Sequence, residues 1–316
     1  MDHRPLGRSG LQIAPLMFGG NVFGWTADMA TSHRMLDAFV DGGFNAVDTA
    51  EAYSSWVPGH SGGESETVIG EWLAARRRRH DVIIATKVGW HGGDATGLLS
   101  PSKISQAVEA SLRRLKTDHI DLYQAHSDDL GTPQEETLAA FGRLIREGKV
   151  RAIGASNFSG ERLASALAIS EREGLPRYES LQPLYNLYDR ERFEGELRPV
   201  CADHEVGVIS YYGLAAGFLT GKYRSQADVA KSVRGPGSAG RYLNDRGLRI
   251  LEALDSVSGR LGATQAQVAL AWVMARPGVT APIASATSVE QLRELMGAAT
   301  LRLDQAAVAE LEAASA

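Results

Sequence analysis

Two polar side chains follow a short apolar run near the start of the chain. The run 44–47 ends in Asp48, and Tyr53 comes one small loop later. This pattern is typical of a buried strand whose carboxyl end delivers side chains into a shared space, which is where parallel α/β barrels keep their active sites. Taken alone, the pair fits a helix cap and an ordinary half-buried aromatic just as well. The rest of the chain decides between these interpretations.

Lys87 and His126 end the apolar runs 82–87 and 120–126 in the same way. Taken singly, Lys87 could be an ordinary surface lysine and His126 an ordinary core histidine. Together with Asp48 and Tyr53 they predict a proton-donating site. A lysine ammonium near Tyr53 would lower the phenol pKa from its usual value of ~10, while Asp48 would neutralise and anchor the lysine. We therefore expect Tyr53 to act as a general acid and a neutral His126 to donate a hydrogen bond to a carbonyl oxygen.

Such a site protonates an oxygen that is gaining negative charge. Hydride delivery to a carbonyl carbon creates that charge, and no side chain can supply hydride, so the site implies a nicotinamide cofactor and a small-molecule carbonyl substrate. The histidines and the single cysteine form no metal-binding motif, so no metal is predicted.

Apolar runs alternate with helical segments along the whole chain, which favours a closed parallel barrel over an open sheet. The predicted strands are 16–19, 46–48, 82–87, 120–126, 152–156, 180–182, 208–211 and 281–285. The predicted helices include 31–41 (capped by Thr31 or Ser32), 64–76, 101–116, 133–147, 160–173 and 192–205. We therefore expect a single (β/α)8 TIM barrel domain over 1–316. It would have an N-terminal hairpin at 4–13 closing one end, a long loop at 217–241 after the seventh strand, and a C-terminal helix at 303–314.

Composition limits the function classes. The chain is 44% hydrophobic and 22% charged, with 33 basic against 38 acidic residues, so a nucleic-acid partner is not expected. No signal peptide or membrane span is visible, which indicates a cytoplasmic protein without a membrane partner. Cys201 cannot form an internal disulfide and is expected to pack inward. The sequence gives no indication of the oligomeric state.

Longer motifs extend these observations over nearly the whole chain. They are 48–53, 85–87, 120–126, 154–158, Gln182 with Tyr185 and Asn186, and 210–223. In these motifs the chain resembles the bacterial-type members of the aldo-keto reductase superfamily. The resemblance implies a catalytic tetrad of Asp48, Tyr53, Lys87 and His126 with the roles argued above.

The resemblance also implies a cofactor site. Ser156, Asn157 and Gln182 would bind the carboxamide of the nicotinamide, Tyr211 would stack on its ring, and 217–222 would wrap the pyrophosphate. The full set of implied cofactor contacts is Gly20, Asn21, Asp48, Ser156, Asn157, Gln182, Tyr211, Gly213, Leu214, Gly217, Leu219, Gly221, Lys222, Ser285, Ala286, Thr287 and Gln291.

Aromatic residues in loops near the strand ends suit a small, partly apolar substrate, although each one fits plain packing as well. The candidates for the substrate pocket are Phe23, Trp25, Trp56 and Trp90, with Asp128 as a polar addition.

One feature departs from the family pattern, and one segment resembles the phosphate-binding loop of a different fold. Family members that prefer the phosphorylated dinucleotide usually have a basic residue just after the eighth strand, whereas this chain has none before Arg293. Thr287, Ser288 and a helix N-terminus would still hold a phosphate, so NADPH is expected as the cofactor, with NADH as an alternative. The segment 235–240 matches G-x-G-x-x-G but follows no strand, and we expect it to be a loop that covers the cofactor.

Two further function classes remain open. The chain also resembles the channel-associated β subunits of the same superfamily, which suggests a nicotinamide-binding redox sensor with little turnover. A barrel isomerase acting on a sugar phosphate is the other alternative, and it would bind no nicotinamide dinucleotide.

Overall fold

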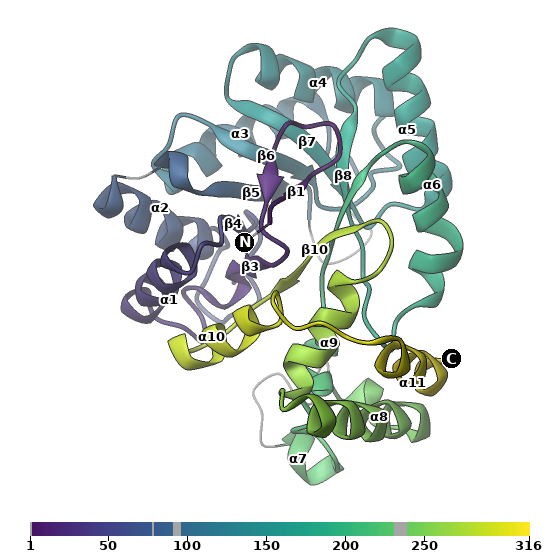
Figure 1. The fold of residues 1–316 in the computed structure, drawn as a ribbon. Helices are drawn as coiled ribbons and strands as arrows, with labels where there is room; N and C mark the ends of the chain where they lie inside the picture. Colours follow the sequence, from purple (N-terminus) through teal and green to yellow (C-terminus); the bar gives the residue numbers. More distant parts are fainter. Residues whose placement is uncertain (1, 78, 91–95, 231–238) are drawn as a thin grey trace.

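The computed structural model describes residues 2–77, 79–90, 96–230 and 239–316. Eight parallel strands close into a barrel surrounded by helices (Figure 1). In order around the barrel they are β3 (Met17–Gly19), β4 (Ala46–Asp48), β5 (Ile83–Val88), β6 (Ile120–Ala125), β7 (Val150–Ser156), β8 (Tyr178–Gln182), β9 (Gly207–Ser210) and β10 (Val279–Ala284). β10 pairs with β3 and completes the ring. The predicted (β/α)8 barrel is confirmed.

Helices follow the strands in the chain and cover the outside of the barrel. They are α1 (Met29–Asp41), α2 (Glu64–Arg76), α3 (Pro101–Leu115), α4 (Gln134–Arg146), α5 (Gly160–Glu173), η3 (Phe193–Leu197) with α6 (Arg198–Asp203), α9 (Gln265–Met274) and α10 (Val289–Gly297). Two short 3-10 turns also occur: η1 (Gly20–Val22) follows β3, and η2 (Arg79–Asp81) lies between α2 and β5.

The predicted cap of the first helix was wrong. Asp28 is the N-cap of α1, and its carboxylate accepts a hydrogen bond from the backbone N–H of Thr31 at 2.7 Å. An Asp side chain at this position satisfies an N–H that the helix itself leaves unpaired. The helix therefore begins earlier than the apolar periodicity indicates.

The N-terminal hairpin is confirmed. β1 (Arg4–Pro5) pairs antiparallel with β2 (Gln12–Ile13). Leu6, Leu11 and Ile13 of this hairpin are buried in one cluster with inward-facing barrel residues such as Leu122 and Ile209. The hairpin thus closes one end of the barrel and removes that apolar layer from water.

The segment after β9 is not a structureless loop. It contains η4 (Ala215–Thr220), α7 (Gln226–Ala230) and η6 (Gly240–Tyr242), followed by α8 (Asp245–Leu261). Residues 235–238 of the G-x-G-x-x-G segment, expected to cover the cofactor, lie outside the described residues. The predicted C-terminal helix is present as α11 (Gln305–Ser315) and packs beside α8.

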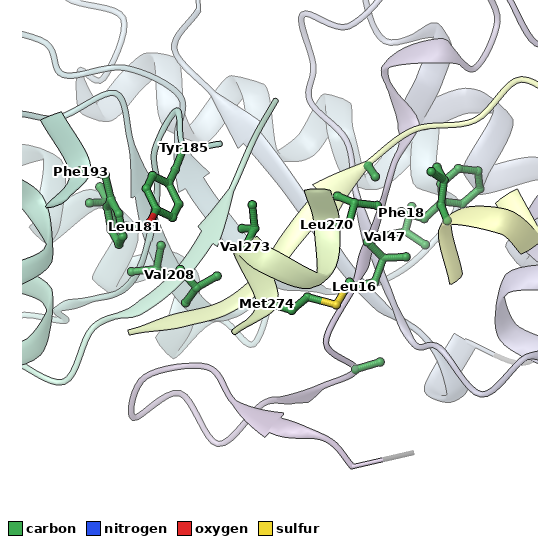
Figure 2. Close-up of a cluster of buried hydrophobic side chains, with 14 of the residues drawn as sticks. Leu16, Phe18, Val47, Leu181, Tyr185, Phe193, Val208, Leu270, Val273 and Met274 are labelled. Carbon is green, nitrogen blue, oxygen red and sulfur yellow. The ribbon is translucent and has the colours of Figure 1, made fainter. Parts of the chain in front are cut away.

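The outer faces of the strands form the main core. Figure 2 shows Leu181 and Val208 from the barrel together with Leu270, Val273 and Met274 from α9. Both faces of a parallel sheet must be buried, so the helices cover the outer one. Cys201 on α6 is 2% exposed, as expected, and burial raises the pKa of its thiol to about 12. Within the described ranges no helix combines the length and the apolarity needed to cross a membrane.

The inner faces of the strands position the polar site. Side chains alternate between the two faces of a strand, so residues two apart point the same way. Ala46, Ala85 and Leu122 form part of an inward apolar layer. Two positions further along the same strands come Asp48, Lys87 and Gln124. The barrel interior therefore changes from apolar near the hairpin to polar at the carboxyl ends of the strands.

Candidate active site

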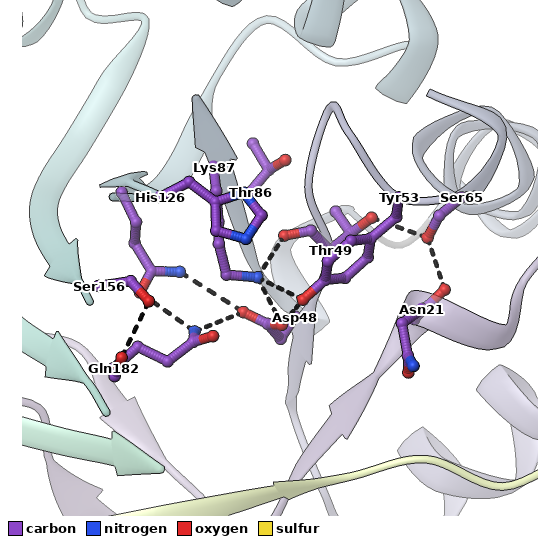
Figure 3. Close-up of polar contacts among 12 residues, drawn as sticks. Asn21, Asp48, Thr49, Tyr53, Ser65, Thr86, Lys87, His126, Ser156 and Gln182 are labelled. Atoms are coloured by element: carbon purple, nitrogen blue, oxygen red, sulfur yellow. Dashed lines mark hydrogen bonds and ion pairs between the residues drawn. The ribbon is translucent and has the colours of Figure 1, made fainter. Parts of the chain in front are cut away.

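Asp48, Lys87 and Tyr53 form one hydrogen-bonded group at the carboxyl end of the barrel (Figure 3). The Lys87 ammonium donates to Asp48 Oδ2 at 2.7 Å, to the Tyr53 hydroxyl oxygen at 2.7 Å and to the Thr49 carbonyl at 2.9 Å. An ammonium has three N–H donors, so all of them are used. Burial lowers the Lys87 pKa, and the carboxylate of Asp48 opposes this shift. The group keeps a buried cation beside the tyrosine.

The Tyr53 pKa contradicts the sequence-based expectation. Burial and the neighbouring Asp48 raise it well above 10.0, whereas the sequence predicted a decrease caused by Lys87. Burial is the larger cause, because it disfavours the charged phenolate. The second cause is that the Tyr53 hydroxyl donates to Asp48 Oδ2 at 3.0 Å, so a carboxylate faces the phenol in addition to the ammonium at 2.7 Å. Tyr53 therefore holds its proton firmly in this state.

The second oxygen of Asp48 is held from the opposite side of the barrel. Gln182 Nε2 donates to Asp48 Oδ1 at 2.8 Å, and Gln124 Nε2 lies 3.5 Å from the same oxygen. Asp48 is only 1% exposed, so these contacts and the Lys87 pair replace its lost hydration. Gln182 thus contacts the tetrad directly.

His126 follows β6 at the mouth of the barrel. Its ring lies 6.0 Å from the Tyr53 ring and 5.0 Å from the Trp90 ring, measured between centroids. Burial, with Lys87 as a second cause, lowers the His126 pKa well below 6.5, so the ring is neutral near pH 7. Its Nδ1 is buried and has no hydrogen-bond partner within the described residues. A neutral imidazole in this position has hydrogen-bonding capacity for a ligand.

Ser156, Asn157 and Tyr211 lie beside Gln182. Ser156 Oγ donates to the Gln182 carbonyl at 2.9 Å, and Asn157 Nδ2 donates to the His126 carbonyl at 2.9 Å. The Tyr211 hydroxyl donates to Asn157 Oδ1, also at 2.9 Å. The structure therefore brings the residues expected at the nicotinamide next to the tetrad.

The segment after β9 adds an exposed cation. A Cβ built at Gly217 would lie 3.3 Å from Lys222 Nζ, so the glycine lets the lysine approach the backbone. Gly217 and Gly221 both have positive φ, of 88° and 78°. Lys222 pairs with no carboxylate in the described part of the chain. The Leu219 side chain is buried in the core, and Gly213 and Leu214 lead into the segment.

The remaining predicted cofactor residues lie around β3, β10 and the start of α10. Gly20 accepts a hydrogen bond from Ser65, and Asn21 Oδ1 accepts one from Ser285 Oγ at 2.5 Å. At α10, the backbone N–H and the hydroxyl of Thr287 both donate to Gln291 Oε1, each at 3.0 Å. The side chain of Ala286 is buried.

The predicted aromatic pocket is only partly assembled. Trp25 and Trp56 meet edge to face with centroids 5.6 Å apart, and Trp56 lies 6.1 Å from Tyr53. Trp56 and Trp90 are 49% and 43% exposed and border the open end of the site. Phe23 is fully buried against Phe18, so its ring belongs to the core. Asp128 forms a two-bond ion pair with Arg162 and is not a free carboxylate.

Sequence reasoning missed Gln124 and the carbonyl of Thr49. A signal for Gln124 was present, because it precedes His126 by two residues in the predicted strand 120–126 and residues two apart share a face. No side-chain pattern indicates a backbone carbonyl such as that of Thr49.

The residues present fit a nicotinamide dinucleotide. The unpartnered His126 Nδ1 and the side chains of Ser156, Asn157 and Gln182 are suited to polar groups of a ligand bound over the tetrad. Lys222 offers a cation, and the neighbouring Gly217 has no side chain to cover its backbone. This combination suits a phosphate.

Comparisons with known proteins agree with this geometry. The model of the family described as "Aldo/keto reductase family" matches residues 15–316. The "Uncharacterized oxidoreductase YrpG" of Bacillus subtilis (strain 168) is 38% identical over 314 residues, which cover 96% of this chain and 93% of the relative. The "Probable voltage-gated potassium channel subunit beta" of Arabidopsis thaliana is 34% identical, covering 94% and 91%. "Protein tas" of Escherichia coli (strain K12) is 32% identical, covering 99% and 97%.

Proposed function

The chain belongs to the aldo/keto reductase family and is an oxidoreductase, and from this premise we propose that it reduces aldehydes or ketones to alcohols with Tyr53 as the general acid. The observation that supports this most is the shared contact of Lys87 and Tyr53 with Asp48 Oδ2, beside a neutral His126. A bound nicotinamide dinucleotide supplies the hydride.

Each residue of the tetrad has a separate task. His126 donates a hydrogen bond that orients the substrate carbonyl. Tyr53 turns its hydroxyl from Asp48 towards that oxygen and gives up its proton as charge develops there. Lys87 continues to donate to the phenolate oxygen that remains, which stabilises it. Asp48 keeps the lysine charged and in place throughout.

For the cofactor we propose NADPH, with NADH as an accepted alternative. Lys222 supports the binding of phosphates, but the Thr287 donors at the start of α10 are already used by Gln291. Calorimetric titration of the protein with NADP⁺ and with NAD⁺ measures the preference directly.

The test of the function is the loss of NADPH absorbance with a panel of aldehydes and ketones. Turnover of at least one class is expected. If neither dinucleotide binds, as measured by quenching of tryptophan fluorescence, the proposal is wrong and the sugar-phosphate isomerase alternative gains support.

The redox-sensor alternative has one specific observation in its favour, namely the similarity to proteins named as potassium channel β subunits. It predicts tight dinucleotide binding with negligible turnover across the same panel. Because Asp48, Tyr53 and Lys87 are hydrogen-bonded to one another and the His126 ring lies beside Tyr53, we propose catalysis as the main function.

The pH dependence follows from the two pKa shifts. The Tyr53 pKa is raised above 10.0, so its acid form persists until the pH exceeds that value, and His126 stays neutral until the pH falls well below 6.5. We therefore expect kcat for reduction to change by less than about twofold between about pH 7 and about pH 9. Steady-state kinetics at saturating substrate check this. A titration with a midpoint inside that range would contradict either the assignment of these two residues or a charged Lys87, whose pKa burial also lowers.

A further inference from the structure

Gln124 is a fully buried amide inside the barrel that the proposed chemistry does not use. It lies on β6, whose neighbours at this level are Lys87 on β5 and Gly154 on β7. A Cβ built at Gly154 would lie 3.1 Å from Gln124 Cγ and 2.3 Å from Ser180 Oγ. The glycine therefore leaves the space in which the Gln124 side chain extends towards Asp48 and Gln182.

The carboxylate of Asp48 fixes the direction of the Gln182 amide. An ionised carboxylate only accepts hydrogen bonds, so the amide nitrogen must face it. Gln182 Nε2 donates to Asp48 Oδ1 at 2.8 Å and to Gln124 Oε1 at 3.2 Å. An amide nitrogen carries two protons, and both are thus used inside the barrel.

The oxygen of Gln182 is left on the other side of the amide. Gln182 Oε1 makes no hydrogen bond within the residues that the structure describes. It is also not one of the buried polar atoms without a partner, so this oxygen keeps some exposed surface. With both protons engaged, the Gln182 side chain offers the site an acceptor only. A ligand group next to it must bring an N–H or O–H.

We propose that Gln124 is a positioning residue that holds the Gln182 amide in place, so that Gln182 Oε1 selects a ligand carrying an N–H donor, such as the primary carboxamide of nicotinamide. The inference rests on the proposed function, because it assigns the cofactor to this position. Without Gln124 the Gln182 amide keeps a single bond to Asp48 and has a buried N–H without an acceptor. It can then turn away from the geometry in which its oxygen meets the ligand.

The test compares two ligands that differ at one group. NADP⁺ has a carboxamide, whereas its 3-acetylpyridine analogue has a methyl ketone, which keeps the carbonyl and lacks the N–H. The ratio of their dissociation constants, measured by calorimetry, reports the hydrogen bond to Gln182 Oε1. We expect the wild type to prefer NADP⁺ by about tenfold, a typical effect of one hydrogen bond.

Gln124→Met should reduce this preference to about threefold or less, because the apolar side chain cannot accept from Gln182. Gln124→Asn keeps the amide but shortens it, and the same loss is expected, which provides a second variant if one folds poorly. Ser180→Ala is the matched control: Ser180 Oγ is buried beside Gly154 and has no partner within the described residues, so the ratio should stay that of the wild type.

The outcomes separate the two claims. If a folded Gln124 variant keeps the wild-type ratio, or if the wild type binds both ligands equally, the role of Gln124 is disproved while the proposed function stands. If the wild type binds neither ligand, the proposed function fails and the inference fails with it.

Discussion

Replacing Tyr53 with phenylalanine is expected to lower kcat for carbonyl reduction by about 10²–10⁴-fold, the usual contribution of a positioned general acid. The substitution removes the hydroxyl that accepts from Lys87 and donates to Asp48. The ring contacts with Trp56 and His126 involve no hydroxyl and can persist. Steady-state kinetics together with a fluorescence titration of NADPH separate the loss of catalysis from a loss of binding.

Tyr123→Phe is the matched control for this variant. The Tyr123 hydroxyl is buried on the outer side of β6 and has no hydrogen-bond partner in the described ranges. Its removal should leave kcat unchanged. If Tyr53→Phe retains wild-type turnover, Tyr53 is not the proton donor.

Replacing Lys87 with methionine is expected to destabilise the fold by about 3–5 kcal/mol, because it removes one partner of a buried ion pair and leaves the Asp48 carboxylate without a cation. Lys87 and Asp48 are 0% and 1% exposed, so water cannot compensate. Urea unfolding measures the change in the free energy of unfolding. Activity should fall by at least about 100-fold, since the phenolate of Tyr53 would lose its donor.

A second substitution separates stability from catalysis. In the double variant Lys87→Met with Asp48→Asn neither member of the pair carries a charge, so most of the lost stability should return while the activity stays low. Lys149→Met is a control at a partly exposed lysine that also pairs with carboxylates, Glu109 and Glu147, and the unfolding midpoint of this variant should barely move. If Lys87→Met is as stable as the wild type, the Lys87–Asp48 pair is not the buried ion pair described above.

Much of the fold was predictable because its signals are local and repeated. The strand β4 (Ala46–Asp48) and the helices α2 (Glu64–Arg76) and α5 (Gly160–Glu173) begin and end where the apolar pattern and the flanking glycines indicate. The short helices after β9 were not predicted, since turns such as η4 (Ala215–Thr220) depend on backbone conformations and tertiary packing that leave no periodic signal. The start of α1 was predicted too late for a related reason, because a helix cap is a single side-chain contact and leaves no periodic signal in the sequence.

The positions of Asp48, Lys87 and His126 were predictable because parallel strands deliver their last inward residues to one end of a barrel. The direction of the Tyr53 pKa shift was not, since it depends on how deeply the hydroxyl is buried and on its contact with Asp48 in addition to Lys87. Phe23 was placed in the substrate pocket because sequence shows only that an aromatic lies near a strand end. Its ring points into the core, where it packs on Phe18.

The central claim is hydride transfer to a carbonyl carbon with proton donation by Tyr53, and one measurement tests it most directly. NADPH carrying deuterium at the transferable C4 position is incubated with the wild type and an accepted aldehyde, and the alcohol is examined by mass spectrometry. We predict a single deuterium on the former carbonyl carbon, formed at least about 100-fold more slowly by Tyr53→Phe. An alcohol without deuterium, or deuterated alcohol formed equally fast by Tyr53→Phe, would contradict this account.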